Sequence, residues 1–470
     1  MTKRVVVAGG GIAGLATAYE LRERAARVPG GLEVQVLEAG PRLGGNLRTE
    51  RVDGYRVESG PNGFLDDVPA TLDLVRRLGL GGELVRASEA AARRFLFRNG
   101  KLHLLPSGLG DFLLSPVLSL SGRLRVLGEP FAKKHPGGDE TVFDFAARRI
   151  GGEAAAVLVD AMVSGVFAGD ARQLSLESAF PKMAAMERQH GGLVRALVAM
   201  QWQKMRAKRS GQTAPRSGGP VGPGGTLTTF RDGIESFVEA LAAALGDGLH
   251  VGRAVRALDR SDRRGWAVAT SSGGAVDADA VVLAIPAAQV APLLAPLDDV
   301  VANTLRQTPN PPLAVVALAY SVEAIGAAPN GFGFLVPRGE ALRILGCLCD
   351  SSLFPGRAPQ GKVLVRAMIG GAHDPHAIEL AEAELVRLAA SEVSRAMGFT
   401  AEPERHWLFR HRAGISQYTV GHGERVDLAL RRLASWPGLF LAGSSYFGVS
   451  MNACIEKAPA LADEIVASLA

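Results

Sequence analysis

Cysteine is scarce in this sequence, with three residues in 470: Cys347, Cys349 and Cys454. One of them must stay unpaired in any disulfide scheme, and the spacing of the first two is not the C-x-x-C of a redox motif. The sequence therefore does not indicate a disulfide-stapled secreted scaffold, and a reducing, cytoplasmic setting is expected. We also expect no metal site.

Long apolar runs are absent as well. The nearest candidate, residues 281–297, is interrupted by Pro286, Pro292 and Pro296, so we predict a buried strand followed by a short helix. A membrane-spanning helix needs about twenty apolar residues, and none is predicted. Because the chain runs directly into its first strand, we expect no signal peptide.

Neither sign of charge dominates, because 52 Lys and Arg residues against 47 Asp and Glu residues give a formal net charge of +5. This excess is too diffuse to indicate nucleic-acid binding, and it fits anionic substrates or anionic lipid headgroups. Hydrophobic residues make up 47% of the chain. A folded protein of two or three domains is therefore expected.

What the sequence does contain is a nucleotide-binding signature near its start. Residues 5–15, VVVAGGGIAGL, predict a buried strand, a glycine turn and the beginning of a helix. Gly9, Gly11 and Gly14 form G-x-G-x-x-G, in which the first allows the tight turn and the second lets a pyrophosphate approach the backbone. The third lets helix and strand pack closely. Free N–H groups at the helix start then favour phosphate, so dinucleotide binding is predicted.

The next residues indicate which dinucleotide. A second strand ends at Glu38, which is placed to bind a ribose hydroxyl. Arg42 then adds a cation, and Gly44 and Gly45 allow a second close backbone approach beside the phosphate site. This stretch resembles the signature of flavoproteins related to amine oxidases, which bind FAD there. The resemblance implies that Glu38 binds the adenosine ribose and that Arg42 and Asn46 lie along the cofactor.

The end of the chain repeats the arrangement of the beginning. Residues 439–442 predict a strand, a glycine turn follows, and a helix begins near Ser450. In flavoproteins of this type such a helix start points at the flavin and stabilises negative charge on the reduced ring. The cofactor domain is therefore expected to be assembled from both ends of the chain.

Between the two ends the pattern changes. Residues 93–106 alternate like a hairpin that turns at Asn99-Gly100, and residues 107–209 predict an all-helical insertion. Its leucines and phenylalanines beside cations suit a monotopic membrane surface, with core packing of the insertion as the alternative. Residues 313–369 then predict a mostly antiparallel sheet.

Six segments together carry a broader resemblance, and the combination of SGVFAGD with QYTVGH is the most specific part of it. The segments are FLFRNGKLHLLPSGL (95–109), SGVFAGDARQLSLESAFP (164–181), GFGFLVP (331–337), AMIGG (367–371), ISQYTVGH (415–422) and GVSMNACIE (448–456). On these segments the chain resembles the oxygen-dependent protoporphyrinogen oxidase family of haem biosynthesis. The resemblance implies oxidation of protoporphyrinogen IX to protoporphyrin IX by FAD, with molecular oxygen as acceptor and hydrogen peroxide as by-product.

The implied fold class is α/β. It combines a Rossmann-like FAD-binding domain of the amine-oxidase type, a mixed-sheet substrate domain and an inserted helical membrane-binding domain. We expect the FAD domain over 1–85, 226–300 and 406–470, the substrate domain over 86–106 and 301–405, the helical domain over 107–209 and a flexible linker over 210–225.

The same resemblance implies the site residues. Five bind substrate: Arg94 pairs with a propionate, Gly165 lines the pocket near a pyrrole ring, and Phe332, Leu335 and Met368 sandwich the macrocycle. No side chain is expected to be catalytic as an acid or base. The positions expected to bind FAD non-covalently are Gly9, Gly10, Gly11, Ile12, Ala13, Gly14, Glu38, Ala39, Arg42, Gly45, Asn46, Gly60, Pro61, Asn62, Gly63, Val255, Trp407, Gly443, Val449, Ser450 and Met451.

Alternatives stay open at this point. A coproporphyrinogen III oxidase is one, although its members tend to lack the arginine that matches Arg94. An amine oxidase or carotenoid desaturase is more distant, because four tryptophans and five tyrosines do not suggest an aromatic cage. A non-enzymatic flavin or porphyrin carrier is the third. The expected partners are a porphyrinogen, oxygen and a membrane surface, with no nucleic acid and a homodimer as one option. The expected location is cytoplasmic, peripheral on the membrane.

Overall fold

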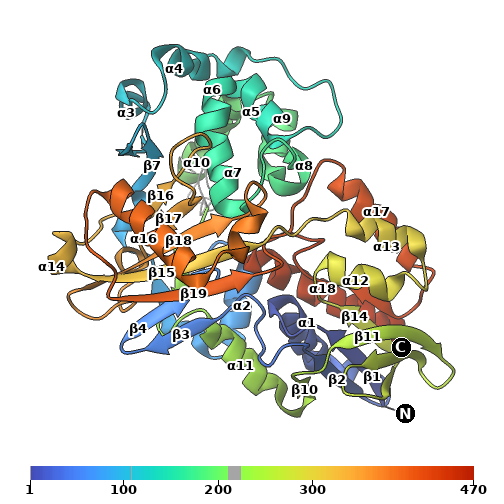
Figure 1. Ribbon diagram of the computed structural model, residues 1–470. Helices are drawn as coiled ribbons and strands as arrows, with labels where there is room; N and C mark the ends of the chain where they lie inside the picture. Colours follow the sequence, from blue (N-terminus) through green and yellow to red (C-terminus); the bar gives the residue numbers. More distant parts are fainter. Residues whose placement is uncertain (1, 107, 210–223, 470) are drawn as a thin grey trace.

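The computed structural model describes residues 2–106, 108–209 and 224–469. The predicted linker over 210–225 lies almost entirely outside these residues. Figure 1 shows two sheet-containing regions and a cap of helices above them.

A five-stranded parallel sheet contains the first and last strands of the chain. Its order is β10 (Leu249–His250), β2 (Leu32–Leu37), β1 (Lys3–Ala8), β14 (Ala280–Leu283) and β20 (Leu439–Leu441). Strand β1 reads KRVVVA, and its valines are fully buried because helices or a second sheet cover both faces.

Residues on alternate sides of these strands enter two separate cores. Val5 and Val7 belong to a core with the helices α1 (Ile12–Glu23), α2 (Pro69–Arg77), α11 (Glu235–Leu245) and α18 (Met451–Leu469). Val6 and Ala8 belong to the opposite core. The elements on that side are β11 (Val255–Ser261), β12 (Gly265–Thr270), β13 (Ala275–Ala278), α12 (Ala287–Leu294), α13 (Asp299–Arg306) and α17 (His422–Leu433). The Rossmann-like assembly from both ends of the chain is confirmed.

A seven-stranded mixed sheet forms the second region. Its order is β19 (Arg405–His411), β15 (Leu313–Ser321), β18 (Lys362–Gly370), β17 (Gly346–Leu348), β16 (Gly333–Leu335), β7 (Arg94–Arg98) and β8 (Lys101–Leu104). All neighbours are antiparallel except β16 and β7. The predicted hairpin is present, since Asn99 and Gly100 both have positive φ, at 52° and 76°.

One face of this sheet is covered by the helix α16 (Glu382–Met397), whose buried side chains join Phe97, Val316 and Ala367 in one core. The opposite face looks toward the cofactor domain and the helical cap. Because β19 belongs to this sheet, we propose to end the substrate domain after His411 rather than at residue 405.

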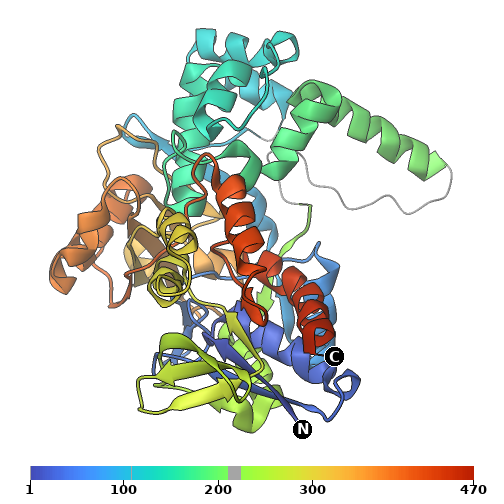
Figure 2. The ribbon, with the colours of Figure 1, turned by 90° about the vertical axis from the view of Figure 1, so that its right-hand side faces the viewer.

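The insertion is helical, as predicted. Its elements are α3 (Leu109–Leu114), α4 (Leu120–Leu127), the 3-10 turn η4 (Glu129–Phe131), α5 (Val142–Ile150), α6 (Gly152–Ala154), the π-helical segment η5 (Ala155–Val159), α7 (Asp160–Phe167), α8 (Leu176–Ala179), α9 (Pro181–His190) and α10 (Leu193–Arg209). Helix α9 ends at Gly191, which has φ +78°, and α10 begins two residues later. Figure 2 shows α10 projecting from the body of the molecule.

Other elements escaped the sequence analysis. The hairpin of β3 (Thr49–Val52) and β4 (Tyr55–Glu58) and the helix α17 are the main ones. Smaller pieces are β5 (Phe64–Leu65), β6 (Leu84–Arg86), β9 (Leu227–Phe230), α14 (Val322–Ile325) and α15 (Asp350–Leu353). No helix among the described residues is long and apolar enough to cross a membrane.

Candidate cofactor and substrate site

The three glycines of the G-x-G-x-x-G turn have different surroundings, as the motif predicts. A Cβ on Gly9 would lie 2.6 Å from the carbonyl oxygen of Ala284, and Gly9 has φ +110°. A Cβ on Gly14 would lie 2.0 Å from the carbonyl oxygen of Gly9. At Gly11 an added Cβ would meet nothing within 4 Å. Gly9 and Gly14 are therefore required by packing, whereas the space over Gly11 is open to a ligand.

Glu38 follows β2 directly and is held at the same turn. Its carboxylate accepts hydrogen bonds from the backbone N–H groups of Gly10 and Gly40, both at 2.7 Å. Each oxygen keeps lone pairs for a hydroxyl donor. The backbone N–H of Arg253 donates to the Glu38 carbonyl at 2.7 Å, which brings the segment before Val255 to the same edge. Ala39 beside it is exposed.

The loop over residues 42–47 lies against the glycine turn. The N–H of Gly44 donates to the Gly10 carbonyl at 2.7 Å, and a Cβ on Gly45 would lie 3.3 Å from the Cα of Gly11. Arg42 donates to the carbonyls of residues 43, 45 and 47 at 3.0, 2.7 and 3.2 Å, and burial lowers its pKa. Its guanidinium thus shapes the loop; Asn46 on the same loop is exposed.

A second loop, residues 59–63, is held from behind by a buried arginine. Arg366 on β18 donates from Nη1 to the carbonyls of Glu58 and Gly60 at 2.8 and 2.7 Å, and its side chain pairs with Asp350. The amide of Asn62 lies 3.5 Å from the same Asp350 carboxylate. Because Arg366 and Asp350 are each 2% exposed, this ion pair fixes the loop to the seven-stranded sheet.

The C-terminal turn meets the first helix and the helical insertion. A Cβ on Gly443 would lie 3.7 Å from the Cβ of Ala13, and the Ser450 hydroxyl accepts from the N–H of Ala453 at the start of α18. Val449 packs in one cluster with Val163 and Phe167 of α7. The start of α18 therefore lies between the glycine turn and the helix that carries Gly165.

The two most specific motifs of the sequence contact each other. Gln417 donates from Nε2 to the Phe167 carbonyl at 2.9 Å, and the N–H of Ser175 donates to the Tyr418 carbonyl at 2.7 Å. The Tyr418 hydroxyl donates to the Ser444 carbonyl at 2.6 Å and accepts from the Gly448 N–H at 2.8 Å. The QYTVGH segment therefore connects the SGVFAGD segment to the C-terminal turn.

The open face of the seven-stranded sheet carries a row of apolar positions. Leu335, Gly346 and Met368 are directly paired across β16, β17 and β18, so they share one face. Gly346 contributes no side chain, and a Cβ there would lie 2.5 Å from the Phe334 carbonyl oxygen and 3.3 Å from the Leu335 Cδ2. A Cβ on Gly165 would lie 2.2 Å from the Leu335 Cδ2, so α7 closes over this row.

Arg94 and Phe332 lie beside the row, because Leu335 pairs with Leu96 on β7 and Arg94 pairs with Gly333. The Arg94 guanidinium carbon is 5.2 Å from the centroid of the Phe332 ring, and Arg94 is exposed. In the described part of the chain it forms no ion pair. Trp407, which was expected to bind FAD, packs on Tyr55, with ring centroids 5.4 Å apart. Leu335, Met368 and Arg94 thus lie on one face of the seven-stranded sheet, with Phe332 next to Arg94 and Gly165 over Leu335.

A separate cavity of about 690 Å³ lies beside the edge strand β20, between α17 and α18. Trp436, Phe440 and Lys457 line it. None of the five predicted substrate residues is in its wall, so it is not the substrate site that the motifs predict.

Comparisons with known proteins agree with this geometry. The model of the flavin-containing amine oxidoreductase family matches residues 12–466. The chain is 30% identical to the coproporphyrinogen III oxidase of Bacillus subtilis, over 99% of this chain and 98% of the relative. It is 34% identical to the protoporphyrinogen oxidase of Bos taurus, over 97% of each. A crystal structure from Exiguobacterium sp. 255-15, provisionally assigned as a protoporphyrinogen oxidase, superposes with a TM-score of 0.83 at 28% identity, covering 99% of both chains.

The chain belongs to the flavin-containing amine oxidoreductase family, in its protoporphyrinogen oxidase branch.

As a member of this family the protein is a flavin-dependent oxidoreductase. The sequence analysis missed three residues that hold its site together, Arg366, Asp350 and Tyr418. An arginine inside the apolar strand KVLVRAMIG was the available signal for Arg366, because a charge buried in a strand needs a partner. Nothing in the sequence named Asp350 as that partner.

Proposed function

We propose that this protein binds FAD non-covalently and oxidises protoporphyrinogen IX to protoporphyrin IX, with oxygen as acceptor and hydrogen peroxide as by-product. The observation that carries the proposal is a single arrangement. The glycine-led turns from both ends of the chain lie against each other, and the C-terminal turn packs on the helix α7. Helix α7 in turn lies over Leu335 on the apolar sheet face, and Arg94 lies on the same face.

The residues present suit FAD. The open space over Gly11 leaves room for a pyrophosphate at the start of α1, where N–H groups and the helix dipole favour anions. Glu38 has lone pairs for a ribose hydroxyl, and the loop over 59–63 and the start of α18 would flank the flavin ring. Non-covalent binding is supported by Cys454, because burial raises its pKa to about 12 and keeps a thiolate from forming.

The substrate proposal rests on shape and charge. A tetrapyrrole is flat and apolar with anionic propionates, and it needs apolar walls and a fixed cation. Leu335, Met368 and Phe332 would provide the walls, and Arg94 would provide a bidentate partner for one carboxylate. Arg94 keeps its guanidinium free of carboxylates in the described structure, so it is available to a propionate.

The chemistry divides between cofactor and protein. The flavin, when bound, would supply the redox chemistry by accepting hydride equivalents and passing the electrons to oxygen. The residues of this chain would bind and orient the macrocycle and exclude water from it. We assign no catalytic acid or base among the five substrate positions, since their side chains are apolar apart from the guanidinium of Arg94.

Coproporphyrinogen III is the second candidate substrate, because a coproporphyrinogen III oxidase is among the relatives covered over nearly the full length. Its four propionates would need more than one cation beside the apolar walls of the proposed substrate site. Arg94 is the single arginine that the resemblance places there, which favours the substrate with two propionates.

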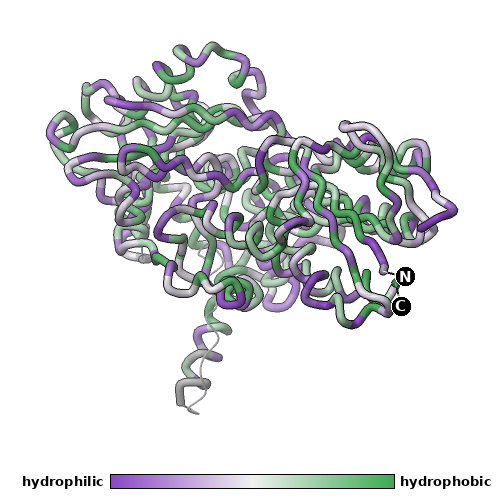
Figure 3. Tube along the Cα trace, turned by 90° about the horizontal axis from the view of Figure 1, so that it is seen from below, coloured by the Kyte–Doolittle hydropathy of each residue, from purple (hydrophilic) through white to green (hydrophobic). Residues whose placement is uncertain are grey.

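The helical insertion supports a peripheral membrane location. Its exposed apolar side chains lie on α3, α4 and η4, at Leu113, Leu114, Leu120, Leu124, Leu127 and Phe131, and on α10, at Val194, Val198, Trp202 and Met205. The four on α10 recur every three or four residues and share one face. In Figure 3 this projecting helix carries hydrophobic and hydrophilic residues together. We call these ten residues the apolar rim.

The rim is continuous across the two parts. Glu129 in η4 accepts from the N–H groups of Leu193 and Val194 at 2.8 and 3.1 Å, which ties the start of α10 to the segment ending in Phe131. Lys133, Lys134 and Arg195 are exposed beside it. Apolar side chains flanked by cations suit an anionic lipid surface.

Purified protein tests the proposal directly. We expect a flavin absorbance spectrum that bleaches when protoporphyrinogen IX is added without oxygen, and porphyrin fluorescence that grows catalytically when oxygen is admitted. Parallel rates on coproporphyrinogen III decide between the two substrates. A colourless protein that stays colourless with FAD would contradict the cofactor assignment, and faster turnover of coproporphyrinogen would contradict the substrate assignment.

A further inference from the structure

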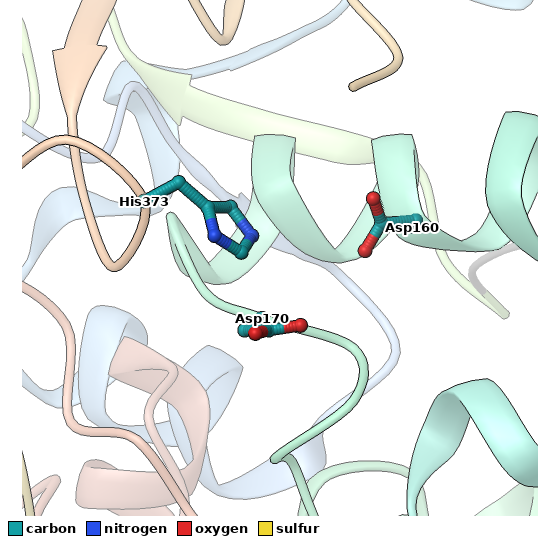
Figure 4. Close-up of side chains that lie close together, drawn as sticks. All are labelled: Asp160, Asp170 and His373. Atoms are coloured by element: carbon teal, nitrogen blue, oxygen red, sulfur yellow. The ribbon is translucent and has the colours of Figure 1, made fainter. Parts of the chain in front are cut away.

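Three side chains of metal-ligating type converge beside the substrate face. Asp160 is the first residue of α7, Asp170 lies in the loop after that helix, and His373 lies in the loop after β18. One candidate ligand atom from each lies within 4.8 Å of the others. Figure 4 shows the Asp160 carboxylate and the His373 ring turned toward each other, with Asp170 beside them. The sequence analysis expected no metal site, because these residues are 10 and more than 200 positions apart.

The Asp160 carboxylate is buried and incompletely paired. Asp160 is 4% exposed, and its Oδ1 has no hydrogen-bond partner. A buried carboxylate oxygen without a donor is costly unless a cation or proton occupies the space in front of it. The unpaired oxygen therefore indicates, separately from the grouping of the three side chains, that the cluster binds a cation.

The nearby arginine does not balance the two carboxylates. Arg338 lies 3.9 Å from Asp160 and 3.5 Å from Asp170, and its side chain is 45% exposed. Asp170 accepts only neutral donors besides, the N–H of Arg172 at 2.9 Å and the amide of Gln173 at 3.3 Å. Arg172 adds a second positive charge to the surroundings of Asp160. Because the Arg338 side chain is partly exposed, its pairing with the two carboxylates is weakened by water.

His373 offers a ring nitrogen to the cluster. That nitrogen lies within 4.8 Å of a carboxylate oxygen of each aspartate, and an imidazole nitrogen binds metals through its lone pair. Its ring nitrogens make no hydrogen bond within the described residues, and nothing there competes for that lone pair.

We propose that Asp160, Asp170 and His373 bind a divalent transition-metal cation, with Mn²⁺ and Zn²⁺ as the class. Two carboxylates and one imidazole form a mixed oxygen and nitrogen set, which suits these ions better than Mg²⁺ or Ca²⁺ with their all-oxygen preference. Metal–ligand bonds of about 2.0–2.2 Å require the three side chains to move together and Arg338 to swing outward. Three protein ligands leave coordination positions open to water.

The site would connect two elements that carry predicted substrate residues. Asp160 is five residues before Gly165 on α7, and His373 is five residues after Met368. The loop of His373 is already tied to the end of α7, since the N–H of Ala372 donates to the Ala168 carbonyl at 2.8 Å. A bound cation would add a second connection and stabilise the helix against the sheet. The inference does not rest on the proposed substrate, because metal alone tests it.

The experiment uses the full-length, flavin-loaded protein after treatment with a chelator, titrated calorimetrically with MnCl₂, ZnCl₂ and MgCl₂. We expect one Mn²⁺ or Zn²⁺ per chain, a raised melting temperature, and much weaker Mg²⁺ binding. His373→Gln and Asp160→Asn should each weaken binding by roughly 10- to 100-fold or more. His376→Gln is the matched control, because its side chain is 84% exposed on the same loop and should leave the affinity unchanged.

Arg338→Gln gives a change of opposite sign. Removing the competing guanidinium should tighten metal binding. Because the Arg338 side chain is partly exposed, we expect this variant to fold, so a change in affinity would not reflect unfolding. Equal affinities in the wild type, His373→Gln and His376→Gln would overturn the proposal, as would weaker binding in Arg338→Gln. Flavin absorbance of each variant verifies that it is folded.

Discussion

At the residue scale, Gly11 and Gly14 stand three positions apart in one turn, yet an added methyl group meets different surroundings at each. At Gly14 it would lie 2.0 Å from a backbone carbonyl, whereas at Gly11 it would lie in open space with an ordinary φ of −74°. The fold therefore requires glycine at position 14, whereas the ligand requires it at position 11. The two roles can therefore be separated by experiment.

We expect Gly11→Ala to fold with an unchanged melting temperature in the flavin-free state but to lose FAD affinity, because its methyl group occupies the ligand space. Gly14→Ala should destabilise the protein itself, by about 1–3 kcal/mol or more for a steric conflict of this kind. Thermal melts of flavin-free protein and FAD titrations measure the two effects. A destabilised apo form of Gly11→Ala would contradict the division.

Arg94 is the residue that we propose to orient the substrate. Arg94→Ala should raise the KM for protoporphyrinogen roughly 10- to 100-fold, which corresponds to the about 1.5–3 kcal/mol of a hydrogen bond to a charged group, while FAD content stays the same. Its neighbour Arg93 is equally exposed, and Arg93→Ala is the control. An unchanged KM for Arg94→Ala would refute the anchoring role.

At the scale of single elements, the strand β18 has two functions in the proposed site. Arg366 and Met368 lie two residues apart on the same face of this strand, so one strand both holds the loop beside the proposed flavin and lines the proposed substrate slot. The buried ion pair between Arg366 and Asp350 makes that connection rigid.

Arg366→Met should therefore lower the free energy of unfolding by about 3–5 kcal/mol, because it leaves the Asp350 carboxylate buried without its partner. The double variant with Asp350→Asn should recover much of that loss. Arg405→Met breaks an exposed pair with Asp53 and should cost less than about 1 kcal/mol. Urea denaturation compares the three; similar losses in Arg366→Met and Arg405→Met would contradict the argument.

The QYTVGH segment contains a buried, pH-sensitive group. The His422 ring stacks on Tyr418 at 3.9 Å between centroids, and neither ring nitrogen has a hydrogen-bond partner. Burial, and then the charge of Arg425, lowers the pKa of His422 from 6.5 to about 4. Because the unfolded chain binds this proton more tightly, His422 contributes stability above pH 6.5 that is lost as the pH falls toward 4.

That loss should amount to about 3 kcal/mol by pH 4. His422→Phe keeps the stacked ring and removes the titrating group. We expect the stability of this variant to fall less steeply than that of the wild type between pH 7 and 5, measured by urea denaturation at each pH. Parallel curves for the two proteins would show that His422 does not titrate in this range.

At the scale of the whole molecule, three chain segments far apart in sequence enclose one site, and the helical insertion projects away from it. Phe131 is 88% exposed and Trp202 is 59% exposed, which is costly in water unless another surface covers them. The apolar rim therefore lies on another part of the insertion than Gly165, which faces the proposed substrate site.

We expect the protein to float with vesicles that contain phosphatidylglycerol and to bind less well as salt is raised. The double variant Phe131→Asp and Trp202→Asp should abolish flotation while turnover of detergent-solubilised substrate persists. Val300→Asp, at an exposed valine of α13 outside the rim, is the control. Flotation of the double variant at wild-type level would exclude the rim as the contact.

The sequence by itself determined the elements whose cause is local. The valine run and G-x-G-x-x-G specify a strand, a turn and a helix over residues 3–23, and Asn99-Gly100 specifies a hairpin, because positive φ and side-chain alternation act within a few residues. The contacts between the SGVFAGD and QYTVGH segments were not visible, although each had been singled out. Helix α17 and the β3–β4 hairpin were missed, since tertiary packing rather than a strong local pattern defines them.

Only the tertiary structure decided which distant side chains meet. Arg366 and Asp350 are 16 residues apart, the cross-strand row through Gly346 joins three strands, and the Asp160, Asp170 and His373 cluster forms where a helix end meets a strand loop. Burial sets the electrostatics of these groups, and burial depends on the packing of the whole chain. A local pattern can specify a strand or a turn, but it cannot say which charge will lose its water or what will lie opposite it.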